Sequence, residues 1–430
     1  MFRFIHTADL HLDSPLKALS RRNADLAEAI GVATRAAFER IVDKAIEERV
    51  AALLISGDLY DGSTKDMRTG LYLAECLRRL GKAGVHTFII LGNHDAETVA
   101  KPPFPDVETL TVFKPKASTH RFEEHEVAIH GASFRDNSVT ADMTPGYPDP
   151  VQGWVNIGML HTSLGGFSEH ADYAPTSPAR LGDKGYDYWA LGHVHKSQVF
   201  QEGTPERPWI VYPGIPQGRD MGETGQGRAV LGTVSDGRIN IEWFDTSAVV
   251  LERVPIDLSS AESFNDIQAE AGDIARTLID ASDHGRALLR PELAVPRALV
   301  PAVRRGRDDL LDLIQTNIQA RTDRVAVEKI GIVASAGDNQ RAEIDKGTLA
   351  HLTDMIRTGA TADSDLVKEL VKDFEAILAK LPPGLRAHPG HLNPLTDLDP
   401  ESADHIAGWL ESMAAEAVAS AAAASKGDGS

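Results

Sequence analysis

The chain has 430 residues, of which 42% are hydrophobic and 25% are charged, a balance typical of soluble globular proteins. Its formal net charge of −19 argues against a stand-alone, high-affinity nucleic-acid binder, because phosphate backbones favour basic surfaces. The single cysteine, Cys76, excludes an internal disulfide framework and a cysteine-based zinc site.

No apolar run approaches the roughly 20 residues that span a bilayer, so we expect no membrane partner. The N-terminal run "MFRFI" is too short for a signal peptide and leads directly into polar residues. A single cysteine fits a reducing compartment, and we therefore expect a cytoplasmic protein.

Residues 1–245 alternate apolar runs with amphipathic stretches. Helices are predicted over 33–49 and 68–84. Several of the apolar runs are continuous, which is typical of a sheet covered on both faces, and the domain is predicted to be layered α/β. The predicted strands are, in chain order, "FRFIHTA" (2–8), "AALLIS" (51–56), "HTFIIL" (86–91), "EVAIHGA" (126–132), "VNIGML" (155–160) and "DYWAL" (187–191).

The pattern changes after residue 245. Residues 246–340 have the order β-α-β-α-β, which predicts a small α+β cap domain without metal-binding residues of its own. Residues 341–419 carry apolar residues at helical spacing and predict a helical C-terminal segment. The ending 420–430 has nothing to pack and is predicted to be disordered.

Five of the predicted strands end in residues of metal-ligand type. Functional groups of α/β sheets gather at the carboxyl ends of strands, so we expect these side chains to converge. Three of the runs have a glycine just before the ligand, which lets the chain turn sharply without a Cβ clash. The residues are Asp9 and His11, then Asp58, then Asn93, His94 and Asp95, then His161, and finally His193 and His195.

Nitrogen and oxygen donors without thiolate suit Mn, Fe or Zn. Two of the aspartates, the asparagine and four histidines make seven ligands, with His94 to spare. Seven ligands exceed one site but suit two metals if one carboxylate is shared. Two metals about 3.5–4 Å apart are a common device for phosphoryl chemistry, because they hold the phosphate and lower the pKa of a bridging water. The sequence therefore predicts a two-metal centre.

The motifs D-x-H, G-D-x-x-D, G-N-H-D, a lone His and G-H-x-H, in this order, resemble those of the calcineurin-like metallophosphoesterases. The segments "IHTADLHLDSPL", "SGDLYD", "LGNHD", "DYWALGHVH" and "YPGIPQGRD" are similar to the DNA repair exonuclease branch of that family, the SbcD/YhaO-like proteins. The resemblance is strong over residues 1–245 and weak beyond them.

The resemblance implies a role for each matched residue. Mn²⁺ is the family's usual activating metal, and the reaction is the hydrolysis of DNA phosphodiester bonds by an exonuclease or endonuclease acting in repair. His94 would lie over the scissile phosphate, and Asp95 would orient it by a hydrogen bond. The implied ligands are Asp9, His11 and His195 for one metal and Asn93, His161 and His193 for the other, with Asp58 as the bridge.

Four further residues are candidate substrate contacts. Asp61 stands where archaeal and eukaryotic relatives carry histidine, which argues against a proton-donating role there. Arg219 follows in a glycine-rich loop, and His170 and Tyr173 lie in "SEHADYAP". An ordinary surface position explains each of them at least as well.

Two other functions fit the same residues. One is a phosphodiesterase or phosphatase acting on nucleotides or small phosphoesters, and the other is a subunit that binds DNA ends without cutting them. For a nuclease, the resemblance implies DNA and a coiled-coil repair ATPase as partners, and it makes a homodimer plausible. The apolar stripes of 341–419 would suit docking to a partner groove, or equally a helical layer packed on its own core.

Overall fold

The computed structural model describes residues 1–14, 31–61, 67–97, 104–136, 139–164, 173–282 and 285–335. The chain divides into two compact units, Met1–Gly337 and Asp338–Ser430. The predicted helical segment 341–419, the predicted disordered tail 420–430 and the candidate residue His170 lie outside the described residues.

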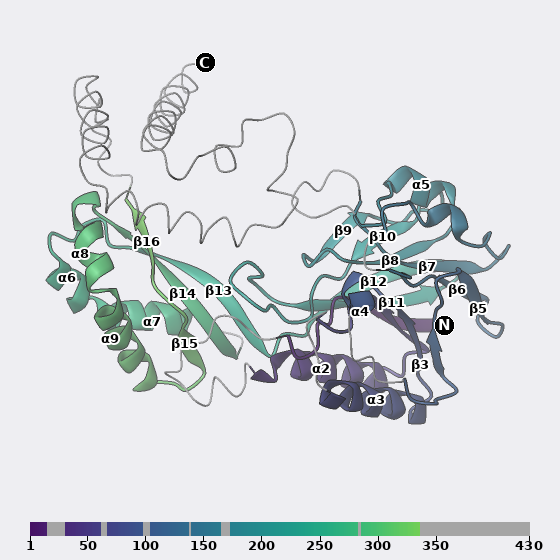
Figure 1. The fold of residues 1–430 in the computed structure, drawn as a ribbon, viewed down its shortest axis with the longest axis horizontal. Helices are drawn as coiled ribbons and strands as arrows, with labels where there is room; N and C mark the ends of the chain where they lie inside the picture. The colour runs from purple at the N-terminus through teal and green to yellow at the C-terminus, as the bar shows by residue number, and fades with distance from the viewer. Residues whose placement is uncertain are drawn as a thin grey trace, which may run out of the picture. The chain divides into compact units, whose positions relative to one another are not determined.

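Two six-stranded sheets build the first part of the chain (Figure 1). The first has the order β12-β11-β1-β2-β3-β4, with β1 (Phe2–Thr7), β2 (Ala52–Ser56), β3 (His86–Ile90), β4 (Leu110–Val112), β11 (Arg228–Ser235) and β12 (Arg238–Asp245). The second has the order β5-β6-β7-β8-β10-β9, with β5 (Ser118–Phe122), β6 (Val127–Gly131), β7 (Val155–His161), β8 (Tyr188–Gly192), β9 (Gln198–Gln201) and β10 (Trp209–Tyr212).

The strands that lead to the predicted ligands run parallel within each sheet. Strands β1 to β4 are mutually parallel, and so are β6, β7, β8 and β10. The antiparallel strands lie at the edges: β11 and β12 beside β1, β5 beside β6, and β9 beside β10. All six strands predicted from the sequence are present, with ends that differ by at most one residue.

Successive side chains along a strand point to opposite faces of its sheet, and both faces are buried. In β1, Phe4 packs into the core between the two sheets, whereas Ile5 packs under helices α2 (Ala33–Glu47) and α3 (Met67–Lys82). On the far side of the second sheet, Trp189 packs with Leu181 of α5 (Pro178–Asp183). The result is the predicted layered α/β arrangement, with helices outside two facing sheets (Figure 1). The short helices α4 (Asn93–Glu97) and η1 (Thr144–Gly146) complete this part.

The cap domain begins with the third sheet. Its strands β13 (Val249–Asp257), β14 (Arg286–Val295), β15 (Val325–Val327) and β16 (Gly331–Ala334) pair with one another in parallel. The connecting helices are α6 (Phe264–Ala269), α7 (Ala271–Asp280), η2 (Arg297–Leu299), α8 (Val300–Arg305) and α9 (Arg307–Gln319). They bury Ile274, Leu310 and Ile314 against Leu289 of the sheet. Among the described helices, none is both long and apolar enough to cross a membrane.

The loop between β10 and β11 is fastened to the first cap strand. The Gln217 side chain accepts the N–H groups of Ala248 and Val249 and donates to the Val249 carbonyl, at 2.8, 3.1 and 2.7 Å. The Gly225 N–H donates to the Leu251 carbonyl at 2.8 Å. These bonds fasten both ends of the loop to the start of β13. The same loop also lies near the predicted metal centre.

One buried histidine ties the two sheets together. His6 of β1 has no solvent exposure, and its Nε2 lies 3.0 Å from the Leu191 carbonyl, which can only accept. Nε2 therefore carries the proton, and Nδ1 accepts from the Tyr188 hydroxyl at 3.0 Å. Burial lowers the pKa of His6 from 6.5 to about 3.

This depressed pKa predicts how stability depends on pH. Between pH 6.5 and 3 the His6 imidazole is protonated in the unfolded state but neutral in the folded state. The free energy of unfolding therefore falls as the pH drops through that range. We expect the loss from this residue to be about 1.4 kcal/mol per pH unit. His6→Gln retains a donor and an acceptor but does not titrate. Urea unfolding at pH 7, 6 and 5 in EDTA should show the wild type losing stability faster than the variant, and parallel losses would contradict the assignment.

Candidate metal centre

The carboxyl ends of the parallel strands of both sheets meet at one place. Strand β2 lies against β7 and β8 of the facing sheet. The loops after β1 and β2 run side by side, because the Asp9 N–H donates to the Gly57 carbonyl and the His11 N–H to the Asp58 carbonyl, both at 3.0 Å. The His193 N–H in turn donates to both carboxylate oxygens of Asp9, at 3.0 and 3.1 Å. Residues from three distant segments therefore share one pocket.

Four of the predicted ligands have an unusual backbone. The φ angles of Asp9, His11, Asp58 and His193 are 52°, 40°, 51° and 96°, in the left-handed region that non-glycine residues rarely adopt. Each such residue costs of order 1 kcal/mol, and glycine would avoid most of that cost. That the chain places aspartate and histidine there indicates that the side chains themselves are required.

The glycines before the ligands make room for other ligands. A Cβ on Gly57 would lie 2.3 Å from Nδ1 of His161, one on Gly92 would lie 2.3 Å from Oδ1 of Asp58, and one on Gly192 would lie 1.9 Å from the Ser56 carbonyl oxygen. Of the three, only Gly57 has a positive φ, 93°. The predicted reason, a sharp turn, therefore applies to Gly57 alone, and close packing is the common cause.

Gly92→Ala tests this crowding. The added methyl group would contact Asp58 and the His161 ring, at 2.3 and 2.9 Å, so one of them must move. We expect a loss of about 1–3 kcal/mol in stability, as for other overpacked sites, together with weaker Mn²⁺ binding. Thermal unfolding and Mn²⁺ calorimetry measure the two effects. Gly146→Ala is the control, because its Cβ would meet nothing within 4 Å.

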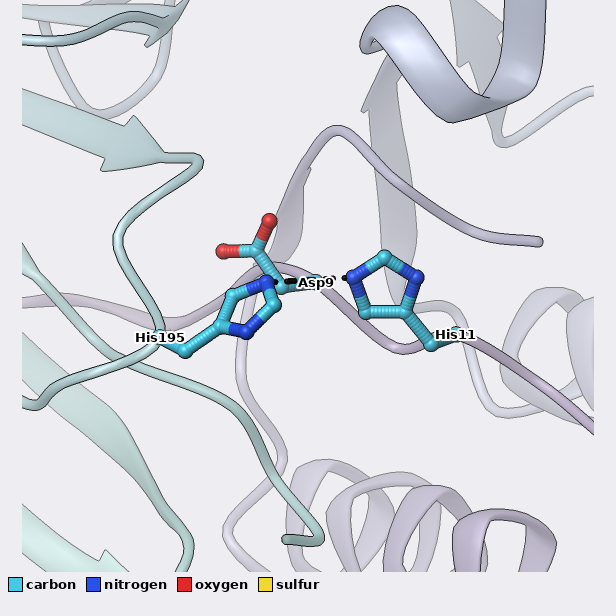
Figure 2. Close-up of side chains that lie close together, drawn as sticks. All are labelled: Asp9, His11 and His195. Atoms are coloured by element: carbon cyan, nitrogen blue, oxygen red, sulfur yellow. Dashed lines mark hydrogen bonds between the residues drawn. The ribbon is translucent and has the colours of Figure 1, made fainter. Parts of the chain in front are cut away.

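The first ligand group comprises Asp9, His11 and His195, whose ligand atoms all lie within 4.8 Å of one another (Figure 2). Nε2 of His11 lies 3.2 Å from Nε2 of His195. Nδ1 of His195 lies 2.7 Å from Oε1 of Glu223 and donates to it, so the lone pair of His195 is on Nε2. Nδ1 of His11 is buried and has no hydrogen-bond partner among the residues that the structure describes. A cation between the two Nε2 atoms fits this arrangement.

The second group comprises Asp9, Asp58 and His161, again within 4.8 Å of one another. Nδ1 of His161 donates to the Ser56 carbonyl at 2.9 Å, which directs Nε2 toward Oδ2 of Asp58 at 3.4 Å and Oδ1 of Asn93 at 3.1 Å. All seven predicted ligands thus lie together, since the His193 ring lies 5.3 Å from that of His161. Asp9 belongs to both groups, whereas Asp58, the predicted bridge, belongs to the second.

Burial and charge set the protonation of the metal-free pocket. Burial raises the pKa of Asp9 to about 6 and lowers that of His11 well below its usual value. Burial alone would also raise the pKa of Asp58, but the neighbouring His161 holds it below its usual value. Conversely, burial opposes charge on His161, but Asp58 and Asp9 raise its pKa to about 9. A divalent cation would supply the positive charge that the His161 proton supplies here, so the residues fit metal ions.

His94 lies beside this pocket. Its ring centroid is 5.0 Å from that of His11, its backbone N–H donates to Oδ1 of Asp58 at 3.1 Å, and its side chain is 36% exposed. Oδ1 of Asp61 is 3.8 Å from its Nδ1, while Oδ2 of Asp61 accepts from the Ser14 hydroxyl at 2.9 Å. The substrate candidate Asp61 is therefore a neighbour of His94.

Asp95 has a different role from the one predicted. Its buried carboxylate accepts the backbone N–H groups of Leu59, Tyr60 and Gly92, at 2.9, 3.1 and 2.9 Å. Its oxygens face these amides, and so Asp95 joins the loop after β2 to the loop after β3. The expected orienting hydrogen bond to His94 is replaced by this link, and the carboxylate beside the imidazole is that of Asp61.

The remaining candidates are placed as follows. The Tyr173 ring lies 5.3 Å from that of His193, at the pocket. The Arg219 guanidinium, a candidate substrate contact, donates to Glu223 through Nε at 3.1 Å and Nη2 at 2.6 Å. The sequence did not point to Glu223 or to Phe134, whose ring lies 5.6 Å from that of His161. Glu223 follows Arg219 by four positions in the same glycine-rich loop, and this was the only signal for it.

Two facing sheets that place two groups of imidazole and carboxylate ligands at their joined edge define a metal-dependent phosphoesterase. Residues 2–197 match the family described as Calcineurin-like phosphoesterase. The uncharacterized metallophosphoesterase YhaO of Bacillus subtilis is 30% identical over 316 residues, which cover 73% of this chain and 77% of YhaO. The chain belongs to the calcineurin-like metallophosphoesterase family.

Further relatives are named for DNA repair. The DNA double-strand break repair protein Mre11 of Methanopyrus kandleri is 27% identical over 235 residues, 50% of this chain and 49% of that protein. The Mre11 protein of Haloferax volcanii is 26% identical over 381 residues, 87% of this chain and 74% of that protein. The chain thus lies in the branch of the family that contains YhaO and the Mre11 repair proteins, and the alignment spans about half of the Methanopyrus protein.

Proposed function

We propose that the protein is a Mn²⁺-dependent nuclease that hydrolyses phosphodiester bonds of DNA during repair, as an exonuclease and endonuclease. The observation that carries the proposal is the convergence of seven imidazole, carboxylate and amide ligands beside a partly exposed histidine, His94. Similarity to proteins named for double-strand break repair supports DNA as the substrate. A cavity of about 770 Å³, lined by His195, Lys196 and Asp220 among others, adjoins the first ligand group at His195.

Asp9, His11 and His195 would hold one metal ion, and Asn93, His161 and His193 the other, with Asp9 or Asp58 shared. Two such ions would hold the phosphate and lower the pKa of a water molecule, whose oxygen would form the new bond to phosphorus. His94 donates a proton to the sugar oxygen that leaves as the P–O bond breaks, because its imidazole lies at the pocket and is 36% exposed. Asp61 lies beside Nδ1 of His94, and Asp95 fixes the loops that carry Asp58 and His94.

A second candidate is a phosphodiesterase or phosphatase for nucleotides or small phosphoesters. The family match supports it, because that match names phosphoester chemistry without naming a polymer. The net charge of −19 supports it too, since a strongly acidic chain repels a polyanion. A DNA-end-binding subunit that does not cut is the third candidate, and a complete ligand set argues against it.

A nuclease assay separates these candidates. Labelled single-stranded and double-stranded DNA and a chromogenic phosphodiester are incubated with Mn²⁺, Mg²⁺ or EDTA. We expect DNA to be shortened with Mn²⁺ and left intact with EDTA. Cleavage of the chromogenic ester alone would favour the small-phosphoester enzyme, and DNA binding without any cleavage would favour the end-binding subunit.

The protein partner and the oligomeric state are predicted only from the resemblance to the repair exonucleases. We propose a coiled-coil repair ATPase as the protein partner, and a homodimer as the assembly. The segment 341–419, the candidate docking surface, lies outside the described residues. Co-purification of the ATPase with the full chain, but not with a chain ending at residue 340, is the expected result.

A further inference from the structure

Glu223 contacts the metal ligand His195 at the ring nitrogen that does not face His11. Its Oε1 lies 2.7 Å from Nδ1 of His195, and its side chain is 14% exposed. A carboxylate oxygen only accepts, so the Nδ1 proton of His195 is held by Glu223. The Nε2 lone pair of the same ring then faces Nε2 of His11, 3.2 Å away (Figure 2).

Arg219 fixes the carboxylate in this orientation. Its Nη2 donates to Oε1 of Glu223 at 2.6 Å, while its Nε and its backbone N–H donate to Oε2 at 3.1 and 2.8 Å. Both carboxylate oxygens are therefore used, and the Arg219 charge balances that of Glu223. A bidentate, charge-assisted contact of this kind restricts rotation of the Glu223 side chain more than a single hydrogen bond does.

The backbone around Glu223 is fixed as well. The Ile215 N–H donates to the His195 carbonyl at 2.9 Å, so the loop begins against the ligand that Glu223 contacts. The loop is then fastened to the cap by Gln217 and Gly225, on either side of Glu223. Glu223 is thus a fixed acceptor whose position depends on the contact between the loop and the first cap strand.

We propose that Glu223 is a positioning residue that sets the tautomer and ring orientation of His195 for metal binding, with Arg219 as its partner. The inference rests on the metal centre of the proposed function and not on its DNA substrate. Carboxylates that accept the far N–H of a metal-binding histidine typically contribute 10–100-fold to metal affinity. Arg219 holds the Glu223 carboxylate, and its Nη2 also lies 3.2 Å from Nδ1 of His195.

The test measures Mn²⁺ binding to the full-length protein by calorimetry. The wild type is expected to bind two ions. Glu223→Ala should weaken one of the two binding steps by about 10–100-fold and leave the other unchanged. Glu223→Gln keeps the size and an accepting oxygen, and should recover part of that loss. Glu328→Gln is the matched control, because Glu328 is 12% exposed and its Oε2 accepts from Arg290 Nε at 2.8 Å in the cap.

The outcomes separate the positioning role from the metal centre itself. Unchanged affinity in both Glu223 variants, or an equal loss at both steps that Glu328→Gln reproduces, would overturn the role of Glu223 while leaving the metal centre intact. A wild type that binds no Mn²⁺ would contradict the metal centre and this proposal with it. Thermal unfolding of each variant shows whether Glu223→Ala is folded, and Glu223→Gln carries the test if it is not.

Discussion

Asp58→Asn should abolish phosphodiester hydrolysis. Asp58 is 1% exposed, its Oδ2 lies 3.4 Å from Nε2 of His161, and its Oδ1 accepts the His94 N–H. The substitution removes one negative charge from the ligand set and keeps the size of the side chain. Because bound metals contribute several kcal/mol to stabilising transition-state charge, we expect activity to fall by about 10³-fold or more. Steady-state hydrolysis of a chromogenic phosphodiester with Mn²⁺ measures this.

Asp245→Asn is the matched control for charge. Asp245 ends β12, pairs with Arg228 at 3.1 Å on the surface, and is 57% exposed at its side chain. Its variant should keep wild-type activity. Equal activity of Asp58→Asn and the wild type would remove Asp58 from the metal centre and with it the proposed mechanism.

His94→Ala should separate catalysis from metal binding. The imidazole lies at the pocket and is 36% exposed, and it belongs to neither of the two metal-ligand groups. We expect hydrolysis to fall by about 10²–10⁴-fold, the usual contribution of a general acid, while two Mn²⁺ ions still bind. Hydrolysis rates and calorimetry on the same preparation measure the two properties.

His125→Ala serves as the comparison for His94→Ala, because His125 is an exposed histidine in the turn between β5 and β6. It should behave as wild type in both measurements. If His94→Ala hydrolysed the substrate at the wild-type rate, another group would have to protonate the leaving oxygen. If it lost Mn²⁺ instead, His94 would be a metal ligand.

The parallel strands and their ligands could be predicted from the sequence because each signal is local. A continuous apolar run such as "AALLIS" predicts a buried strand, and the ligand follows at its end. The hairpin of β11 and β12 was not predicted, although its signal was present. Asp236 and Gly237 both have positive φ, 51° and 69°, as a type I′ turn requires, and Asp-Gly is the usual sequence for it.

The contacts around the ligands could not be predicted from local sequence. Asp95 stands next to His94 in the chain, yet its carboxylate accepts amides from the neighbouring loop. Glu223 contacts His195 across 28 residues, and only the folded loop brings them together. In the same way, Gly192 is required because the Ser56 carbonyl of another strand lies where its Cβ would be. These roles depend on how loops from different strands meet, and motif order does not encode that.

The most direct test is to locate bound manganese. Crystals of the full chain grown with Mn²⁺, measured at the manganese absorption edge, should give two anomalous peaks about 3.5–4 Å apart. One should lie among Asp9, His11 and His195, and the other beside Asp58 and His161. Peaks elsewhere, or none at saturating Mn²⁺, would show that the loop tips from residue 9 to residue 195 do not form a metal centre.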